Sequence, residues 1–186
     1  MGQTKIPTPA KIIAGLIYRN PAKKDKLLVL LRRRFGEIDF CSQEFDFNYT
    51  DYYYLEMGEP LKRLFVSFRK LVHEDSLPFI KTYTNGLEKL FSIKGKRQIN
   101  IDPGFLSLGK LILATTKDHN HRIYMGKGIF AEATLFYQQG SFRPWPWTYL
   151  DYRSQEYIAI FNSIRQKYFS QIKTYILSVA YFKNKH

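Results

Sequence analysis

The chain has 186 residues, 45% of them hydrophobic, so it is long enough to bury a core and we expect one domain over 1–186. Its 29 Lys and Arg residues outnumber its 16 acidic residues, and the net charge of +13 favours anionic partners, although a basic surface that only serves solubility is the alternative. A single cysteine excludes an internal disulfide, and the absence of a long apolar stretch predicts a cytoplasmic protein with no membrane partner.

The first part of the chain alternates between predicted strands and helices. The apolar run 11–18 indicates a buried strand. Asn20 and Pro21 supply a cap and a first-turn proline for a helix that ends at Gly36 and carries a basic, solvated face. From 38 to 49 the apolar alternation changes from even to odd positions, which predicts a bulge or a break between two strand segments.

A strand over 61–72 is predicted to have two different faces. Arg63 and Phe65 lie on one face, and the other carries Leu64, Val66 and Phe68. A second helix is predicted from Ser76 to Phe91. Its inward positions would be Leu77, Ile80, Tyr83, Leu87 and Leu90, and its outward positions Lys81, Asn85 and Glu88.

A strand over 97–101 completes the order strand, helix, strand, strand, helix, strand. This is the order of a ferredoxin-like (βαββαβ) α+β unit, in which an antiparallel sheet carries both helices on one face, and we place this core at about 10–102. Asp102-Pro103-Gly104 then predicts a turn, and apolar residues at helical spacing predict a short helix over 106–116.

The remaining chain is predicted to extend the core. A hairpin pairs 122–125 with 129–137 around Gly126-Lys127-Gly128. Pro144-Trp145-Pro146-Trp147 must be extended, and we expect the tryptophans to pack this strap, 144–147, onto the body of the protein. A long helix over about 154–182 has an apolar seam made of Tyr157, Phe161, Ile164, Tyr168, Ile172, Tyr175 and Val179. The seam either covers a sheet face or binds a partner helix in a homodimer.

The candidate site lies in the extension, 103–150, together with Asp102 at the end of the core. Catalytic candidates there are Asp102, His121 and Glu132, with His121 as a general base. The candidates for binding a phosphate are the cations and hydroxyls Lys110, Thr115, Thr116, Lys117, Arg122 and Lys127. Alternatively, the threonines bond to their own backbone. His119 and His121 could also take part in a metal site, but a solvated loop is the simpler interpretation, and no cofactor follows from the sequence.

A second candidate surface lies on the strand over 61–72. Phe65-Val66-Ser67-Phe68 matches only the end of an RNA-recognition signature, F-V-x-F, in the strand where that fold carries it. Arg63 and Phe65 on one sheet face could combine phosphate contacts with base stacking. The alternative is that the terminal helix or the tryptophan strap covers this face.

Several motifs resemble those of a bacterial family catalogued as domain of unknown function 4416. They are Tyr52-Tyr53 with Glu56-Met57-Gly58 and Leu61-Lys62-Arg63, Asn100-x-Asp102-Pro103-Gly104, Ala114-Thr115-Thr116-Lys117, His121-Arg122-Ile123-Tyr124 and Trp147-Thr148-Tyr149-x-Asp151-Tyr152. The resemblance covers nearly the whole chain and implies GTP binding for some members, but no established activity. A conventional GTPase does not fit, because the G-x-x-x-x-G-K-[ST] phosphate loop is absent from the sequence.

Three functional hypotheses follow. The first is a protein that binds a phosphate-bearing ligand, either a nucleotide such as GTP or RNA, through a basic polar site. The second is an enzyme that acts on a nucleotide or phosphoester at the same site, with or without a metal. The third is an interaction protein that assembles through its C-terminal helix.

Overall fold

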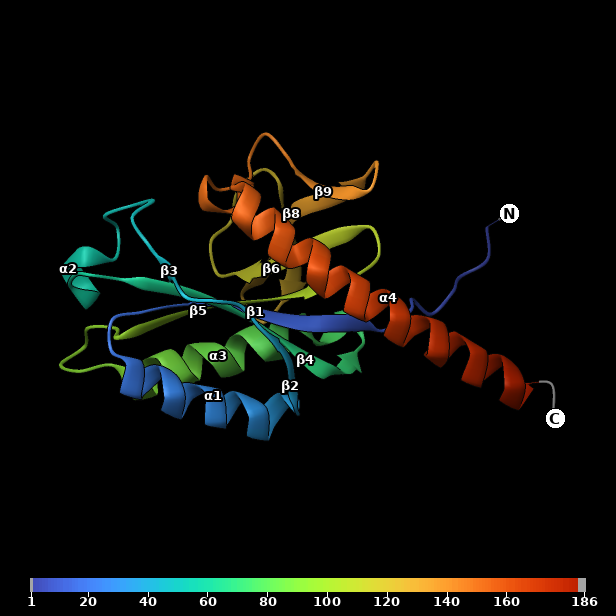
Figure 1. Ribbon diagram of the computed structural model, residues 1–186, viewed down its shortest axis with the longest axis horizontal. Coiled ribbons are helices and arrows are strands. Elements are labelled where there is room, and N and C mark those ends of the chain that lie inside the picture. The colour runs from blue at the N-terminus through green and yellow to red at the C-terminus, as the bar shows by residue number, and fades with distance from the viewer. Residues whose placement is uncertain (1, 184–186) are drawn as a thin grey trace.

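The computed structural model describes residues 2–183, whose strands form an antiparallel sheet with helices on both faces (Figure 1). The strands are β1 (Ala10–Tyr18), β2 (Ile38–Cys41), β3 (Phe45–Asp46), β4 (Lys62–Val72), β5 (Ile99–Leu106), β6 (Lys110–Thr115), β7 (Arg122–Gly126), β8 (Ile129–Gln138) and β9 (Ser141–Pro144). The helices are α1 (Pro21–Phe35), α2 (Tyr54–Met57), α3 (Leu77–Phe91) and α4 (Gln155–Lys183), with short 3-10 turns η1 (Glu74–Ser76) and η2 (Asp151–Arg153). The predicted α+β class and the long C-terminal helix are confirmed.

The strand order is β2-β4-β1-β5-β6-β8-β7, with β3 paired to β4 and β9 paired to β8. All these neighbours are antiparallel. The predicted break in 38–49 is confirmed, because β2 and β3 are separate strands that both pair with β4. Strand β1 is buried along its whole length, and its Gly15 pairs with Phe65 of β4 on one side and Asp102 of β5 on the other.

Helices α1 and α3 lie together on one face of the sheet (Figure 1). As predicted, Pro21 is the first residue of α1, and the Asn20 side chain accepts a hydrogen bond from the Lys23 amide at 3.1 Å. The helix ends at Gly36, whose φ of +94° glycine adopts without steric cost. The core on this face is built from α1, α3 and the inward side chains of β1, β4 and β5, including Leu27, Leu31, Leu64, Val66 and Phe68.

The predicted helix over 106–116 is wrong, because β5 continues to Leu106 and β6 follows as the other strand of a hairpin. Leu111 to Ala114 are all buried, which suits a strand in the middle of a sheet, and a run this short does not distinguish strand from helix by periodicity. The predicted turn at Asp102-Pro103-Gly104 is also wrong. A Cβ on Gly104 would lie 2.1 Å from the carbonyl oxygen of Ile112, so this glycine allows close approach of two backbones rather than a turn.

Strand β6 pairs with β5 only at Gly104 to Leu106, so on this edge of β5 no strand within residues 2–183 pairs with 99–103. At Ile101, side chains of α3 supply the hydrogen-bond partners that a neighbouring strand would otherwise provide. Lys81 Nζ donates to its carbonyl oxygen at 3.0 Å, and Glu88 Oε1 accepts from its amide at 2.7 Å. The prediction that Lys81 and Glu88 face outward is therefore wrong: both are buried, because the unpaired strand edge needs hydrogen-bond partners.

Helix α4 covers the opposite face of the sheet (Figure 1). The predicted seam is buried from Tyr157 to Ile172, where it packs on Ile13, Phe65 and the β6–β9 half of the sheet. Tyr175 is 43% exposed, because α4 continues past the sheet (Figure 1), and the side chain of Val179 lies outside the described residues. The seam that could have joined a partner helix is thus occupied by the protein's own sheet over most of its length.

Candidate functional site

Two arginines organise the polar interior of the α4-side face of the sheet. We call Arg63 with Asp102 and Asp151 the Arg63 centre, and Arg122 with Glu132 and His121 the Arg122 centre. The chain between Trp145 and Arg153 joins them, because the Tyr149 hydroxyl contacts Arg122 and the Asp151 carboxylate contacts Arg63. Residues that are far apart in the sequence therefore form two neighbouring charged groups.

In the Arg63 centre, one buried guanidinium bridges two carboxylates. Nη1 of Arg63 donates to Asp102 at 2.8 Å and Nη2 donates to Asp151 at 2.9 Å, while the arginine side chain is 1% exposed. Burial alone would raise the pKa of Asp102, but the Arg63 guanidinium and the Lys81 ammonium outweigh it and hold that pKa below its usual range. Burial raises the pKa of Asp151 despite the same guanidinium. The two carboxyl groups therefore differ in proton affinity.

Gly15 lets the Arg63 guanidinium cross β1 and reach Asp102 on β5. A Cβ built on Gly15 would lie 3.3 Å from Nη1 of Arg63, 3.0 Å from Cε1 of Phe65 and 3.1 Å from the Tyr152 hydroxyl. Gly15→Ala is expected to lower the free energy of unfolding by about 1–3 kcal/mol, because an extra methyl group overpacks the site. Gly86→Ala is the control: Gly86 lies inside α3 with nothing within 4 Å of an added Cβ, so stability should rise slightly in urea unfolding. Equal effects of the two substitutions would contradict this account.

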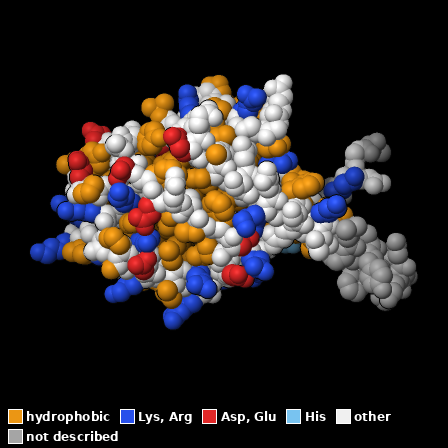
Figure 2. Space-filling view, in the orientation of Figure 1, with side chains coloured by type: hydrophobic (Ala, Val, Ile, Leu, Met, Phe, Trp, Pro, Cys, Tyr) orange, Lys and Arg blue, Asp and Glu red, His pale blue; other side chains and the backbone are white. Residues whose placement is uncertain are grey.

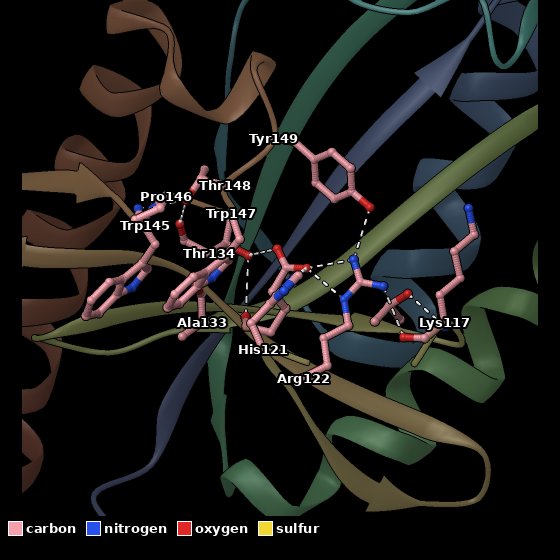
Figure 3. Close-up of polar contacts among 12 residues, drawn as sticks. Lys117, His121, Arg122, Ala133, Thr134, Trp145, Pro146, Trp147, Thr148 and Tyr149 are labelled. Carbon is pink, nitrogen blue, oxygen red and sulfur yellow. Dashed lines mark hydrogen bonds and ion pairs between the residues drawn. The ribbon is translucent and has the colours of Figure 1, made fainter. Parts of the chain in front are cut away.

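In the Arg122 centre, Arg122 of β7 and Glu132 of β8 are cross-strand partners with side chains on the same face. Arg122 Nε donates to Glu132 Oε2 at 2.8 Å and its Nη2 lies 2.7 Å from the same oxygen. Nη1 donates to the carbonyl oxygen of Lys117 at 3.0 Å, and Nη2 donates to the Tyr149 hydroxyl at 3.0 Å. The guanidinium is thus used internally, in bonds that hold the loop after β6 and the chain around Tyr149 in place (Figure 3).

His121 belongs to the same centre, with its Nε2 3.2 Å from Oε2 of Glu132. Its ring also forms part of a set of four nearly parallel rings, which we call the aromatic row: His119, His121, Trp147 and Trp145. Successive centroids are 5.9, 5.4 and 5.1 Å apart with interplanar angles of 1°, 15° and 7°. These distances correspond to offset stacking. In Figure 3 the rings of His121, Trp147 and Trp145 lie side by side below the strap.

The predicted packing of the strap, 144–147, is confirmed. Trp147 Nε1 donates to the carbonyl oxygen of Ala133 at 3.0 Å, and the Trp145 ring lies 4.4 Å from that of Phe136 between centroids. The Thr148 hydroxyl donates to the carbonyl oxygen of Thr134 at 2.6 Å. Trp147 nevertheless keeps 37% of its surface exposed and His119 is also exposed, so the row is fixed to β8 while part of it faces solvent.

The other predicted ligand-binding residues do not converge on this centre. Lys110 pairs with Glu74 at 3.2 Å, and Nζ of Lys127 lies 4.7 Å from the centroid of the Phe79 ring. The Thr115 hydroxyl accepts a hydrogen bond from the Lys117 amide at 3.2 Å, as in the alternative that the threonines bond to the nearby backbone. Thr116 is exposed. Lys117 directs its Nζ towards Tyr52, 4.8 Å from the ring centroid. Figure 2 likewise shows Lys and Arg side chains spread over the face in view, with acids between them.

Phe65 lies under α4 rather than on a free sheet surface. It is 1% exposed, and its ring centroid lies 4.6 Å from that of Tyr157 and 5.1 Å from that of Phe161. A base therefore has no access to this ring in the structure, which agrees with the alternative that the terminal helix covers the face. Arg63, on the same face, is equally buried and is bonded to the two aspartates.

Sequence reasoning missed Asp151, Tyr149 and the aromatic row as a unit. The W-T-Y-x-D pattern at 147–151 was visible, but nothing in it shows that its tyrosine and aspartate reach two different arginines. As for the predicted metal alternative, the residues within 2–183 contain no group of three or more His, Cys, Asp or Glu side chains arranged to hold an ion. His119 and His121 contact each other by stacking.

Comparison with known proteins identifies the family and nothing more specific. In the part of the chain that the structure describes, no helix has the length and apolar character needed to cross a membrane. Neither a curated protein nor a solved structure matches the chain. Residues 8–168, which include both arginine centres and the aromatic row, match the model of the family described as Domain of unknown function (DUF4416). The chain therefore belongs to this family, as its motifs indicated.

Proposed function

We propose that the protein binds single-stranded RNA on the surface formed by the aromatic row. The observation that carries this proposal is the row itself, in which four rings are held nearly parallel and partly exposed. Proteins that bind single strands combine aromatic rings, on which bases stack, with cations that attract the phosphates. The exposed thiol of Cys41 supports a reducing, cytoplasmic setting.

Rigid positioning of the rings favours binding by stacking. Trp147 is fixed by its hydrogen bond to Ala133, and His121 by Glu132, so little conformational freedom would be lost when a base packs against the row. Base stacking on an aromatic side chain contributes about 1–3 kcal/mol. The positive charge of Arg122 is balanced by Glu132, so in this proposal Arg122 positions the residues of the surface and does not bind a phosphate.

The charge of the protein favours an extended ligand over a free nucleotide. The net charge of +13 is spread over the chain, so an RNA strand with many phosphates gains more from it than a nucleotide such as GTP. A nucleotide would contact one end of the row, whereas a strand can extend along the exposed edges of its rings.

Intrinsic fluorescence can test the proposal without a label, because both tryptophans of the chain lie in the row. A short single-stranded RNA at low salt is expected to quench this fluorescence, with affinity falling as salt rises. Trp147→Ala should weaken binding about 5- to 150-fold, as measured by RNA anisotropy, because it removes the ring that joins His121 to Trp145 in the row, and one aromatic contact with a base is worth about 1–3 kcal/mol.

The matched control is Arg33→Gln on α1, on the opposite face of the sheet. It removes a positive charge but leaves the row intact, so it should weaken binding by less than about threefold. If Arg33→Gln and Trp147→Ala have equal effects, the binding reflects total charge and the row is not the interface. Quenching by GTP but not by RNA would favour the nucleotide hypothesis instead.

We further propose that the unit from β1 to β5 is a ferredoxin-like core. The order β2-β4-β1-β5, the antiparallel pairing of all these neighbours, and the position of α1 and α3 on one face support this assignment. On this basis, β6 to β9 and α4 extend the core and carry the proposed RNA surface.

A further inference from the structure

The contact of His121 with Glu132 uses one ring nitrogen, Nε2, and leaves the other, Nδ1, free to accept a proton. Nε2 lies 3.2 Å from Glu132, and within residues 2–183 no side chain or backbone group bonds Nδ1. Glu132 also forms an ion pair with Arg122 and accepts from the Thr134 hydroxyl at 3.3 Å. Because a carboxylate in an ion pair accepts hydrogen bonds, we assign the proton of neutral His121 to Nε2. This assignment leaves the lone pair on Nδ1.

The position of His121 suits proton transfer better than a purely structural role. The ring is held on both faces, by His119 and Trp147, and its side chain keeps 24% of its surface exposed. A carboxylate that fixes the tautomer and orientation of a histidine is the arrangement used to position a general base. The second imidazole, His119, lies 5.9 Å away between centroids with its plane parallel to that of His121.

We propose that this site cleaves the RNA strand it binds, by internal transesterification, with His121 as general base and His119 as general acid. The inference rests on the proposed function, since the row must first hold the strand. Nδ1 of His121 removes the proton of a ribose 2′-hydroxyl, and that oxygen forms a bond to the adjacent phosphorus. The bond from phosphorus to the 5′-oxygen breaks, and this oxygen takes a proton from the His119 imidazolium. The products are a 2′,3′-cyclic phosphate end and a 5′-hydroxyl end.

The step is balanced without an added metal, oxidant or second substrate. The nucleophile comes from the RNA itself, so DNA cannot react in this way. Electrostatic stabilisation of the transition state comes from the excess positive charge of the protein.

The experiment compares two RNA strands of one sequence, one of them with a single 2′-deoxyribose, in the presence of EDTA. Wild-type protein should cut the first strand and leave the deoxy-substituted linkage intact, with cyclic phosphate ends on the products. His121→Gln is expected to cut at least about 100-fold more slowly, the lower limit for losing a general base. Because His121 is also a ring of the row, its loss should weaken RNA binding, so both proteins are compared at saturating protein concentration in single-turnover cutting, where the rate no longer depends on affinity.

His73→Gln is the matched control, a histidine substitution beside η1 that is purified in the same way. It should cut at the wild-type rate, and equal loss in both variants would overturn the proposal, as would cutting of the deoxy-substituted linkage. Binding without cutting by wild-type protein refutes this inference and leaves the proposed function standing, whereas absence of binding refutes both. The comparison of the two strands needs no variant, so it remains decisive if His121→Gln does not fold.

Discussion

Arg63→Met is expected to lower the free energy of unfolding by about 3–5 kcal/mol, because it leaves two carboxylates without their shared cation. The Asp151 side chain is 10% exposed and that of Asp102 27%, so water would replace the guanidinium poorly at Asp151 and only in part at Asp102. Methionine keeps most of the volume of the arginine stem, so the loss of charge dominates. Urea unfolding monitored by circular dichroism would measure the effect.

A triple variant provides the control for this prediction. Adding Asp102→Asn and Asp151→Asn to Arg63→Met removes the uncompensated charges and should restore most of the lost stability. If the triple variant is as unstable as Arg63→Met alone, packing rather than charge explains the effect.

The same centre predicts how the penalty depends on pH. In the wild type, the pKa of Asp102 is lowered, so ionised Asp102 stabilises the fold fully at pH values above the usual carboxyl pKa. This stabilisation is lost as the pH falls through the lowered pKa. The pKa of Asp151 is raised by burial, so its ionisation has the opposite sign and costs stability as pH rises through that pKa. Without Arg63 both carboxyl groups bind protons at higher pH, so the penalty for Arg63→Met should be smaller at about pH 4 than at about pH 7.

Phe161→Ala is expected to cost about 3–5 kcal/mol of unfolding free energy, because it leaves a cavity between α4 and the sheet. The side chain is 0% exposed, and its ring lies 5.1 Å from that of Phe65 and 5.7 Å from that of Tyr152 between centroids. These contacts attach α4 to the face that contains the Arg63 centre. Thermal and urea unfolding would both report the loss.

Phe169→Ala is the matched control in the same helix, because Phe169 is 51% exposed. It should change stability by less than about 0.5 kcal/mol. A large effect of Phe169→Ala together with a concentration-dependent loss of size would instead favour the hypothesis that α4 assembles two copies of the chain. Equal, small effects of both substitutions would show that α4 does not depend on the sheet.

The two arginine centres give the proposed RNA surface a rigid base. The chain from Tyr149 to Asp151 is bonded to Arg122 at one end and to Arg63 at the other, while the strap before it holds both tryptophans. Substitutions at Arg63 should therefore disturb the row indirectly through lost stability, whereas Trp147→Ala should alter binding directly, in addition to the stability lost with its hydrogen bond to Ala133. This difference separates residues that contact the ligand from residues that position them.

The sequence alone determined those elements whose ends and buried faces depend only on interactions between residues close together in the chain. Asn20, Pro21 and Gly36 mark α1 because capping, a fixed proline φ and a positive glycine φ act within a few residues. The alternation in β4 and the three-to-four spacing in α4 predicted the buried faces for the same reason. The family was also recognised from motifs within the chain.

Only the tertiary structure decided how the polar residues are used. Gly104 resembles a turn residue until the Ile112 backbone lies against it, and Lys81 resembles a surface lysine until the unpaired edge of β5 needs a donor. The sequence by itself determined which residues are charged, aromatic or apolar and the local periods in which they recur. Sheet register and burial decided that Arg63 pairs with Asp102 and Asp151, and that four rings from two separate loops align. These contacts join residues up to 88 positions apart, and no local sequence pattern encodes them.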